Sequence, residues 1–106
     1  MSDKSVTVIA QIKVKEGMEK KVRGELLKLI EPSRSEPGCI VYDLYQSADS
    51  KSLFMFYECW KSKRDLDEHL QKPYTKAFIG KTEMFAEPIK VSLWGMISER
   101  QGLLRQ

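Results

Sequence analysis

Apolar and polar residues alternate from Val6 to Val14, so that every second side chain is apolar. Successive side chains of a β-strand point to opposite faces of its sheet, and this period of two therefore predicts a strand. The same period returns in Cys39–Gln46 and in Leu53–Trp60, which a short polar stretch joins. We expect these two segments to pair as an antiparallel hairpin. A fourth alternating run, IKVSLWGMI, follows Pro88 and predicts a last strand.

Helical spacing separates these strands. Apolar residues recur three and four positions apart after the first strand, at Met18, Val22, Leu26, Leu29 and Ile30, which is typical of an amphipathic helix that Pro32 disturbs near its end. Ser62 stands three residues before Asp65, a capping-box spacing that predicts a short helix ending before Pro73. A further helical segment is expected over about 74–86. The resulting order, βαββαβ, predicts an α+β ferredoxin-like fold with a four-stranded antiparallel sheet.

The alternation also sorts the sheet residues into two faces. The face expected to lie under the helices collects Val8, Ala10, Ile12, Ile40, Tyr42, Leu44, Phe54, Phe56, Glu58, Trp60, Ile89, Val91 and Leu93. The opposite face is also rich in apolar residues, namely Ile9, Val41, Tyr45, Leu53, Met55, Tyr57, Trp94 and Met96. A monomer would leave this second apolar surface in water. We therefore expect a homodimer in which two sheets pack face to face.

Glu58 is the only charged residue that this assignment places on the helix-facing side of the sheet. An isolated carboxylate in such surroundings would be costly, so it would shift its pKa or find a partner. The short second helix offers one imidazole, His69, on the same face as Leu66 and Leu70. The sequence therefore predicts a buried pair of Glu58 and His69.

Length and charge narrow the functional classes. The chain has 106 residues, which suits one domain with a core over about residues 6–97 and a C-terminal tail at 98–106. Its 18 basic and 15 acidic residues give a net charge of +3 and are scattered, so nucleic acid and membranes are not expected as partners. The longest apolar run, LFMFY, is too short to span a bilayer, and the first residues lack the apolar core of a signal peptide. We expect a soluble cytoplasmic protein.

Cofactor motifs are missing from the sequence. Cys39 and Cys59 form no C-x-x-C pair, and together with a single histidine they make no plausible zinc site. Both thiols are expected to be small core residues. No glycine-rich dinucleotide motif is present either, so we expect the protein to work without a metal or organic cofactor.

Two segments, SRSEPGCIVYDLYQ and FYECWKSKRDLDEHLQKPYTKAF, resemble the antibiotic biosynthesis monooxygenase (ABM) domain family, whose small members include quinol monooxygenases. The resemblance covers about Val6 to Met96 and rests on EPGC with Tyr42, on the E-x-W of the third strand, and on HL followed by Pro and Phe. It implies a dimeric α+β barrel with a ligand cavity between each sheet and its own helices. It also implies oxidation of quinols or polycyclic phenols by O₂ without flavin, haem or metal. Many relatives carry a histidine where this chain has Tyr74.

Several residues are candidates for a functional site because of their chemistry and their places on the sheet and helices. His69 would be a general base for a phenolic proton, because an imidazole ordinarily has a pKa of about 6.5. Glu58 would orient the imidazole ring and stabilise its protonated form, and Trp60 would hold an aromatic substrate by stacking. The walls of the cavity are expected at Tyr42, Phe56, Tyr74, Phe78 and Ile12. Arg34 is expected to be a solvated or ion-paired surface residue.

Other functions remain open at this point. The domain would also suit a non-catalytic dimeric module that binds a small ligand or responds to stress, with Glu58 and His69 as a purely structural pair. A third alternative is an isomerase of the same fold that acts on a phosphorylated sugar, although no basic cluster for phosphate is evident. A haem-degrading branch of the family relies on an asparagine in the first strand, and VTVIAQIKV contains none. The fold alone does not choose among these functions.

Overall fold

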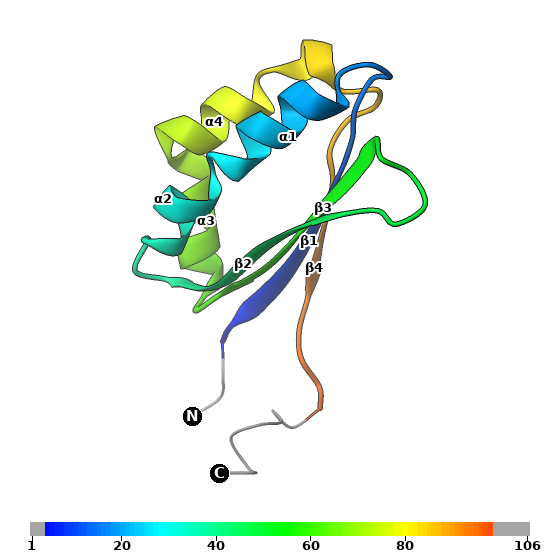
Figure 1. Cartoon of the computed structure of the whole chain (residues 1–106). Coiled ribbons are helices and arrows are strands. Elements are labelled where there is room, and N and C mark those ends of the chain that lie inside the picture. Colours follow the sequence, from blue (N-terminus) through cyan, green and yellow to red (C-terminus); the bar gives the residue numbers. More distant parts are fainter. Residues whose placement is uncertain (1–3, 99–106) are drawn as a thin grey trace.

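The computed structural model describes residues 4–98 and has the predicted ferredoxin-like α+β fold. Its elements are β1 (Val6–Lys13), α1 (Glu19–Leu27), α2 (Ile30–Arg34), β2 (Cys39–Gln46), β3 (Leu53–Trp60), α3 (Lys63–Gln71), α4 (Pro73–Ile79), the 3₁₀ turn η1 (Thr82–Met84) and β4 (Lys90–Trp94). All strand pairs are antiparallel, and the strand order is β2-β3-β1-β4. The four α-helices lie on one side of this sheet (Figure 1).

The helical segments are shorter than the sequence predicts. The expected first helix is divided into α1 and α2, because Pro32 has no N–H to bond the carbonyl of Lys28, four residues before it. The N–H of Leu29 instead bonds to the carbonyl of Leu26 at 3.1 Å, which tightens the chain at the division. The segment expected over 74–86 is also divided, because α4 ends beside Gly80, a poor helix former, and only η1 follows.

The start of α3 follows the predicted cap. The Oγ of Ser62 accepts a hydrogen bond from the N–H of Asp65 at 3.1 Å and donates one to Oδ2 of Asp65 at 2.8 Å. Such a cap satisfies an N–H group that the first helical turn leaves without a partner, and it typically stabilises a helix by about 1 kcal/mol. Because the cap fixes where α3 begins, it also fixes where His69 lies in the last turn of that helix.

The two faces of the sheet follow the predicted alternation except at Ile40. The pairing of β2 with β3 shifts in register between Cys39 and Val41, so Ile40 is the extra residue of a β-bulge. The prediction that Ile40 lies under the helices is wrong, because its side chain is 45% exposed. Cys39 takes the place against the core instead, because the bulge interrupts the period of two. The last strand is also shorter than expected and excludes Ile89 and Ile97.

The helices cover the sheet unevenly. Buried core side chains come from β1, β2, β3, α1, α3 and α4, and include Val8, Ile12, Leu26, Phe54, Trp60 and Leu66. On the edge strand β4, Val91 and Leu93 lie on the same face, opposite Ala10 and Val8 of β1. They are nevertheless 60% and 48% exposed, so the helical layer leaves the β4 edge open.

The other face of the sheet has no helix on it (Figure 1). Three of its apolar residues, Tyr45, Trp94 and Met96, are more than half exposed. Five more are half-buried, namely Ile9, Val41, Leu53, Met55 and Tyr57. Within residues 4–98, no helix is long and apolar enough to cross a membrane.

Candidate active site

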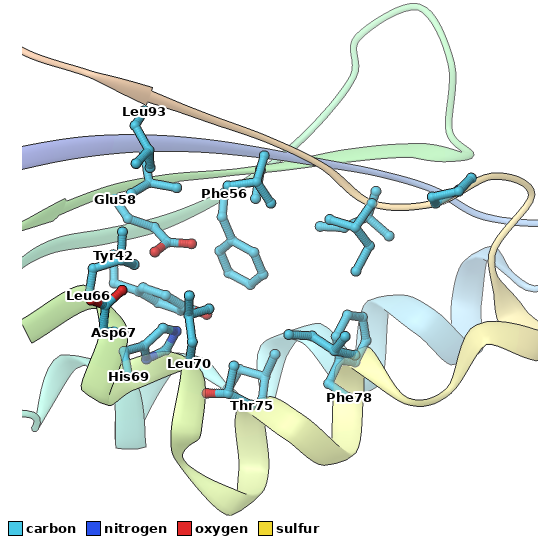
Figure 2. Close-up of a pocket in the computed structure, with 18 of the residues that line it drawn as sticks. Tyr42, Phe56, Glu58, Leu66, Asp67, His69, Leu70, Thr75, Phe78 and Leu93 are labelled. Carbon is cyan, nitrogen blue, oxygen red and sulfur yellow. The ribbon is translucent and has the colours of Figure 1, made fainter. Parts of the chain in front are cut away.

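A cavity of about 660 Å³ lies between the sheet and the helices α3 and α4 (Figure 2). Four predicted wall residues, Ile12, Tyr42, Phe56 and Phe78, line it, and the rings of Tyr42 and Phe56 are 4.6 Å apart between centroids. Exposed apolar residues of β4, α3 and α4 continue the lining toward the open edge, among them Val91, Leu93, Leu70 and Ile79. A largely apolar cavity of this size suits a small-molecule ligand.

Two predicted catalytic residues, Glu58 and His69, face this cavity from opposite sides. Glu58 extends into the cavity from β3 and His69 from α3. Figure 2 shows both side chains at the same end of the cavity as Tyr42. Both side chains are buried, with 5% and 3% exposure. The sequence therefore predicted correctly that the structure brings these two residues together in the cavity.

The predicted hydrogen-bonded pair of Glu58 and His69 is not what the structure contains. The Nδ1 of His69 lies 2.8 Å from Oε2 of Glu36, a buried residue in the turn between α2 and β2. The same Oε2 accepts a hydrogen bond from the hydroxyl of Tyr74. A carboxylate only accepts hydrogen bonds, so this arrangement assigns the ring proton to Nδ1 and leaves Nε2 of a neutral His69 as an acceptor.

The Nε2 atom is the chemically available part of His69. Among residues 4–98, none forms a hydrogen bond with Nε2, while the ring itself lines the cavity. The ring is held from the other side by Trp60, whose ring centroid is 4.5 Å away at an interplanar angle of 33°. Glu36 and Trp60 together fix the imidazole so that a proton acceptor is presented to a ligand.

Trp60 and Tyr74 do not hold the positions predicted for them. Trp60 is 0% exposed and packs beneath His69, so no substrate can stack on it. Tyr74 is not part of the cavity wall, because its hydroxyl turns toward Glu36 and the carbonyl of Pro32, the latter at 3.2 Å. Both aromatic residues therefore support His69 rather than line the ligand cavity.

Glu36 is a candidate site residue that the sequence analysis did not name. The EPGC segment carries part of the family resemblance, but no role was predicted for its acidic residue. Its contact with His69 spans 33 positions in the sequence, so no local pattern predicts it. The available signal was a charged residue within the motif that carries the resemblance.

Glu58 has a different environment. Its Oε1 accepts a hydrogen bond from Nε1 of Trp60 at 2.9 Å, and no other bond to its carboxyl group occurs within residues 4–98. Burial raises the pKa of Glu58 above its ordinary value of 4.5, against the opposing effects of the Trp60 hydrogen bond and of His69. The carboxylate of Glu36 raises this pKa further. Glu58 is therefore a buried carboxyl group that holds its proton to a higher pH than an exposed glutamate does.

Further polar side chains line the same cavity. Thr75 is buried on α4, and its Oγ1 has no hydrogen-bond partner among the residues that the structure describes. Lys63 and Asp67 contribute from α3, and their Nζ and Oδ1 atoms pair with each other at 2.8 Å in an exposed position. Burial, followed by the charge of Glu58, raises the pKa of Tyr42, so its phenol stays protonated.

Residues expected to lie outside the site do so. Arg34 forms an ion pair with Asp43 at 2.9 Å, as one of its predicted roles requires. Cys59 is buried, and Cys39 packs against the core, where burial raises the pKa of its thiol to about 11. Within residues 4–98, no three His, Cys, Asp or Glu side chains gather in a way that could hold a metal ion.

Comparisons with known proteins agree with this fold. The sequence profile described as "Antibiotic biosynthesis monooxygenase" matches residues 5–81. The "Putative monooxygenase Rv0793" of Mycobacterium tuberculosis is 35% identical over 97 residues, which is 89% of this chain and 93% of that protein. The solved structure of Rv0793 has a TM-score of 0.84 at 31% identity and covers 90% of this chain and 97% of its own. The "Putative monooxygenase YcnE" of Bacillus subtilis is 28% identical over 87 residues, 81% of this chain and 92% of that protein.

Proposed function

The chain belongs to the antibiotic biosynthesis monooxygenase family, and we propose that it oxidises a quinol or polycyclic phenol with O₂, with His69 as the general base. The observation that carries this proposal is the arrangement of His69. Its Nδ1 is bonded to a buried glutamate at 2.8 Å, and its Nε2 is available in an apolar, aromatic-lined cavity. Two relatives, named "Putative monooxygenase Rv0793" and "Putative monooxygenase YcnE", support the reaction class.

The proposed reaction starts with a proton transfer. Nε2 of His69 takes the hydroxyl proton of the substrate, and Glu36 stabilises the resulting imidazolium through Nδ1. The aromatic anion transfers one electron to O₂, and the two radicals combine to form a carbon–oxygen bond. The imidazolium returns the proton to the peroxide, which then loses water and leaves a carbonyl group. The phenol loses two hydrogen atoms and gains one oxygen atom, and the second oxygen atom leaves as water, so no external reductant is required.

The cavity contributes position and exclusion of water. Apolar walls such as Ile12, Phe56 and Phe78 hold a flat ligand and shield a reactive radical pair from solvent. Tyr42 remains a protonated phenol in this wall, since burial raises its pKa. The protein's part in the chemistry is thus to remove one proton in a dry, shaped site.

Oxygen consumption by metal-free protein tests the proposal. We expect O₂ uptake with at least one compound from a panel of quinols, hydroxynaphthoquinones and anthrones, and a loss of about 10² to 10⁴-fold in kcat for His69→Ala. Glu68→Ala is the matched control, because Glu68 precedes His69 on α3 but its side chain is 59% exposed and paired with Arg64. No uptake by the wild-type protein across the panel would favour the non-catalytic binding module. An unchanged kcat in His69→Ala would end the proposal for His69 as the base.

The cavity does not favour an isomerase of a phosphorylated sugar. Among its lining residues, Lys63 is the only lysine or arginine, and its Nζ is already paired with Asp67. Recognition of a phosphate group usually requires several donors or a cluster of cations. A neutral or weakly acidic aromatic ligand suits the lining better.

We further propose a homodimer formed through the uncovered face of the sheet. This face has five half-buried apolar residues beside the more exposed Tyr45, Trp94 and Met96 (Figure 1). An apolar surface of this kind is stabilised when a second sheet covers it. Sedimentation should give twice the chain mass of 12.3 kDa at micromolar concentration. Met55→Glu should dissociate the dimer, whereas a monomeric wild-type protein would contradict the proposal.

A further inference from the structure

Glu58 is a buried acid that the proposed proton transfer does not use. Its side chain is 5% exposed and lines the cavity, and Figure 2 shows its carboxyl group extending from β3 toward the helices. One oxygen, Oε1, is occupied by the N–H of Trp60. Within the described part of the chain, no group bonds to the other oxygen, Oε2. One hydrogen-bonding position of Glu58 is therefore left for a ligand.

The groups around Glu58 come from every neighbouring element. On β2, Tyr42 is its register partner, and on β1 the partner is the apolar Val8, which in turn pairs with Leu93 of β4. On the helical side, the titratable groups are His69 and, behind it, Glu36.

Among residues 4–98, no side chain forms an ion pair with Glu58, although the electrostatic effect of His69 opposes the rise that burial causes in its pKa. At the cavity wall, Lys63 is paired with Asp67. His69 is occupied by Glu36 through Nδ1.

An ionised carboxylate in this position would be costly. It would lie in an apolar cavity with a single neutral donor, close to the negative charge of Glu36. Burial accordingly raises the pKa of Glu58. In a protonated carboxyl group, one oxygen still accepts a hydrogen bond and the other carries an O–H donor. Oε1 of Glu58 would then accept the bond from Trp60, and Oε2, which has no partner among the described residues, would carry the O–H.

We propose that Glu58 is a binding site for a carbonyl oxygen, to which its neutral carboxylic acid donates a hydrogen bond. The preferred ligands are then uncharged aromatic compounds with both a hydroxyl group and a conjugated carbonyl group. The placement of the hydroxyl group at Nε2 of His69 rests on the proposed function. When that hydroxyl loses its proton, negative charge develops on the conjugated carbonyl oxygen, where the O–H of Glu58 stabilises it.

Binding of matched ligands under anaerobic conditions tests this inference without any turnover. The probes are 1-naphthols with an acetyl or an ethyl group at position 2 or position 4, so that each pair differs in one carbonyl oxygen at a chosen distance from the hydroxyl. For the wild-type protein, we expect at least one acetyl compound to bind about tenfold more tightly than its ethyl counterpart by titration calorimetry. Glu58→Leu should remove this preference and leave binding of the ethyl compound within about threefold.

The pH dependence provides a second measurement that does not rely on Glu58→Leu folding. Glu58→Gln keeps an acceptor for Trp60 and a donor for the ligand, and it cannot ionise. In the wild-type protein the preference for the acetyl compound should fall as pH rises and Glu58 loses its proton, whereas Glu58→Gln should keep it. Ionisation of the naphthol affects both proteins equally.

The outcomes separate this inference from the proposed function. Equal acetyl-to-ethyl ratios in wild type and Glu58→Leu, or identical pH dependence in wild type and Glu58→Gln, would overturn the carbonyl site. Neither result depends on O₂ uptake. Conversely, a carbonyl preference that depends on Glu58, in a protein that consumes no O₂ with any substrate, would leave the carbonyl site standing and reject the oxygenase.

Discussion

Two buried carboxyl groups, Glu36 and Glu58, lie near His69, and their surroundings differ. Glu36 lies outside the cavity wall and accepts hydrogen bonds from Nδ1 of His69 and from the hydroxyl of Tyr74. Glu58 lines the cavity and accepts one bond, from Trp60. With two donors on its carboxyl group, Glu36 is placed to orient the imidazole, whereas Glu58 has one donor in an apolar cavity, where burial raises its pKa. Residue type alone would have given both glutamates the same role.

The largest difference between the two carboxyl groups is expected when each is neutralised in turn. Glu36→Gln should lower kcat about 10- to 100-fold, because the amide no longer stabilises the imidazolium and can present a donor to Nδ1. Glu58→Gln should lower kcat only about threefold or less, since glutamine retains both a donor and an acceptor. Steady-state kinetics per folded protein would measure both effects. Equal losses in the two variants would mean that the carboxyl groups do not have distinct roles.

A double mutant isolates the part of the loss that acts through His69. In a His69→Ala background, Glu36→Gln should have little further effect on kcat, because no ring is left to orient. Multiplicative losses would show that Glu36 acts on the reaction by another route. Thermal unfolding of each variant separates these effects from a loss of folded protein.

A smaller loss of kcat is expected when Glu36 loses the donor that Tyr74 provides. Tyr74→Phe removes one of the two donors to Glu36 but keeps the aromatic ring, so we expect a loss of about two- to tenfold in kcat. Burial, together with the bond to Glu36, raises the pKa of Tyr74, so its hydroxyl is a donor throughout the working range. Phe78→Leu is an informative contrast, because Phe78 lines the cavity and should change KM more than kcat. An unaffected kcat in Tyr74→Phe would show that one donor is enough to hold Glu36.

The pH dependence of stability gives the smallest expected effect. The folded state raises the pKa of Glu58 above 4.5, so it binds this proton more tightly than the unfolded state does. This contribution to the free energy of unfolding is fully present below the unfolded pKa and is lost as pH rises through the folded pKa. The wild-type protein should therefore lose stability relative to Glu58→Gln over that interval in urea unfolding. A constant difference between the two proteins would contradict a raised pKa.

Local patterns in the sequence were sufficient for most of the fold. The period of two located all four strands, and the Ser62 cap located α3, because both depend on neighbours a few residues away. The bulge at Ile40 was missed, since it depends on how β2 pairs with β3. The sequence predicted that Pro32 disturbs the end of the first helix, but not that this helix is divided into α1 and α2.

The site was predictable only in part, for a related reason. Sheet alternation and helix spacing placed Glu58 and His69 in one cavity. The partners of His69 depend on contacts between distant segments. Glu36, which contacts the ring, lies 33 positions from His69 in the sequence. Tyr74, which bonds to Glu36, lies 38 positions from Glu36. Trp60 was assigned to the correct face, but its packing beneath the imidazole depends on how closely α3 approaches β3.

The tautomer of His69 is the most direct test of the central claim, that Glu36 holds this ring with Nε2 free to accept a proton. The chain contains one histidine, so its ring nitrogen signals in a ¹⁵N-labelled sample need no further assignment. Long-range ¹H–¹⁵N correlation spectra above the titration range of the ring should show the proton on Nδ1 and an unprotonated Nε2, and this preference should weaken in Glu36→Gln. A neutral ring with its proton on Nε2 would contradict the account.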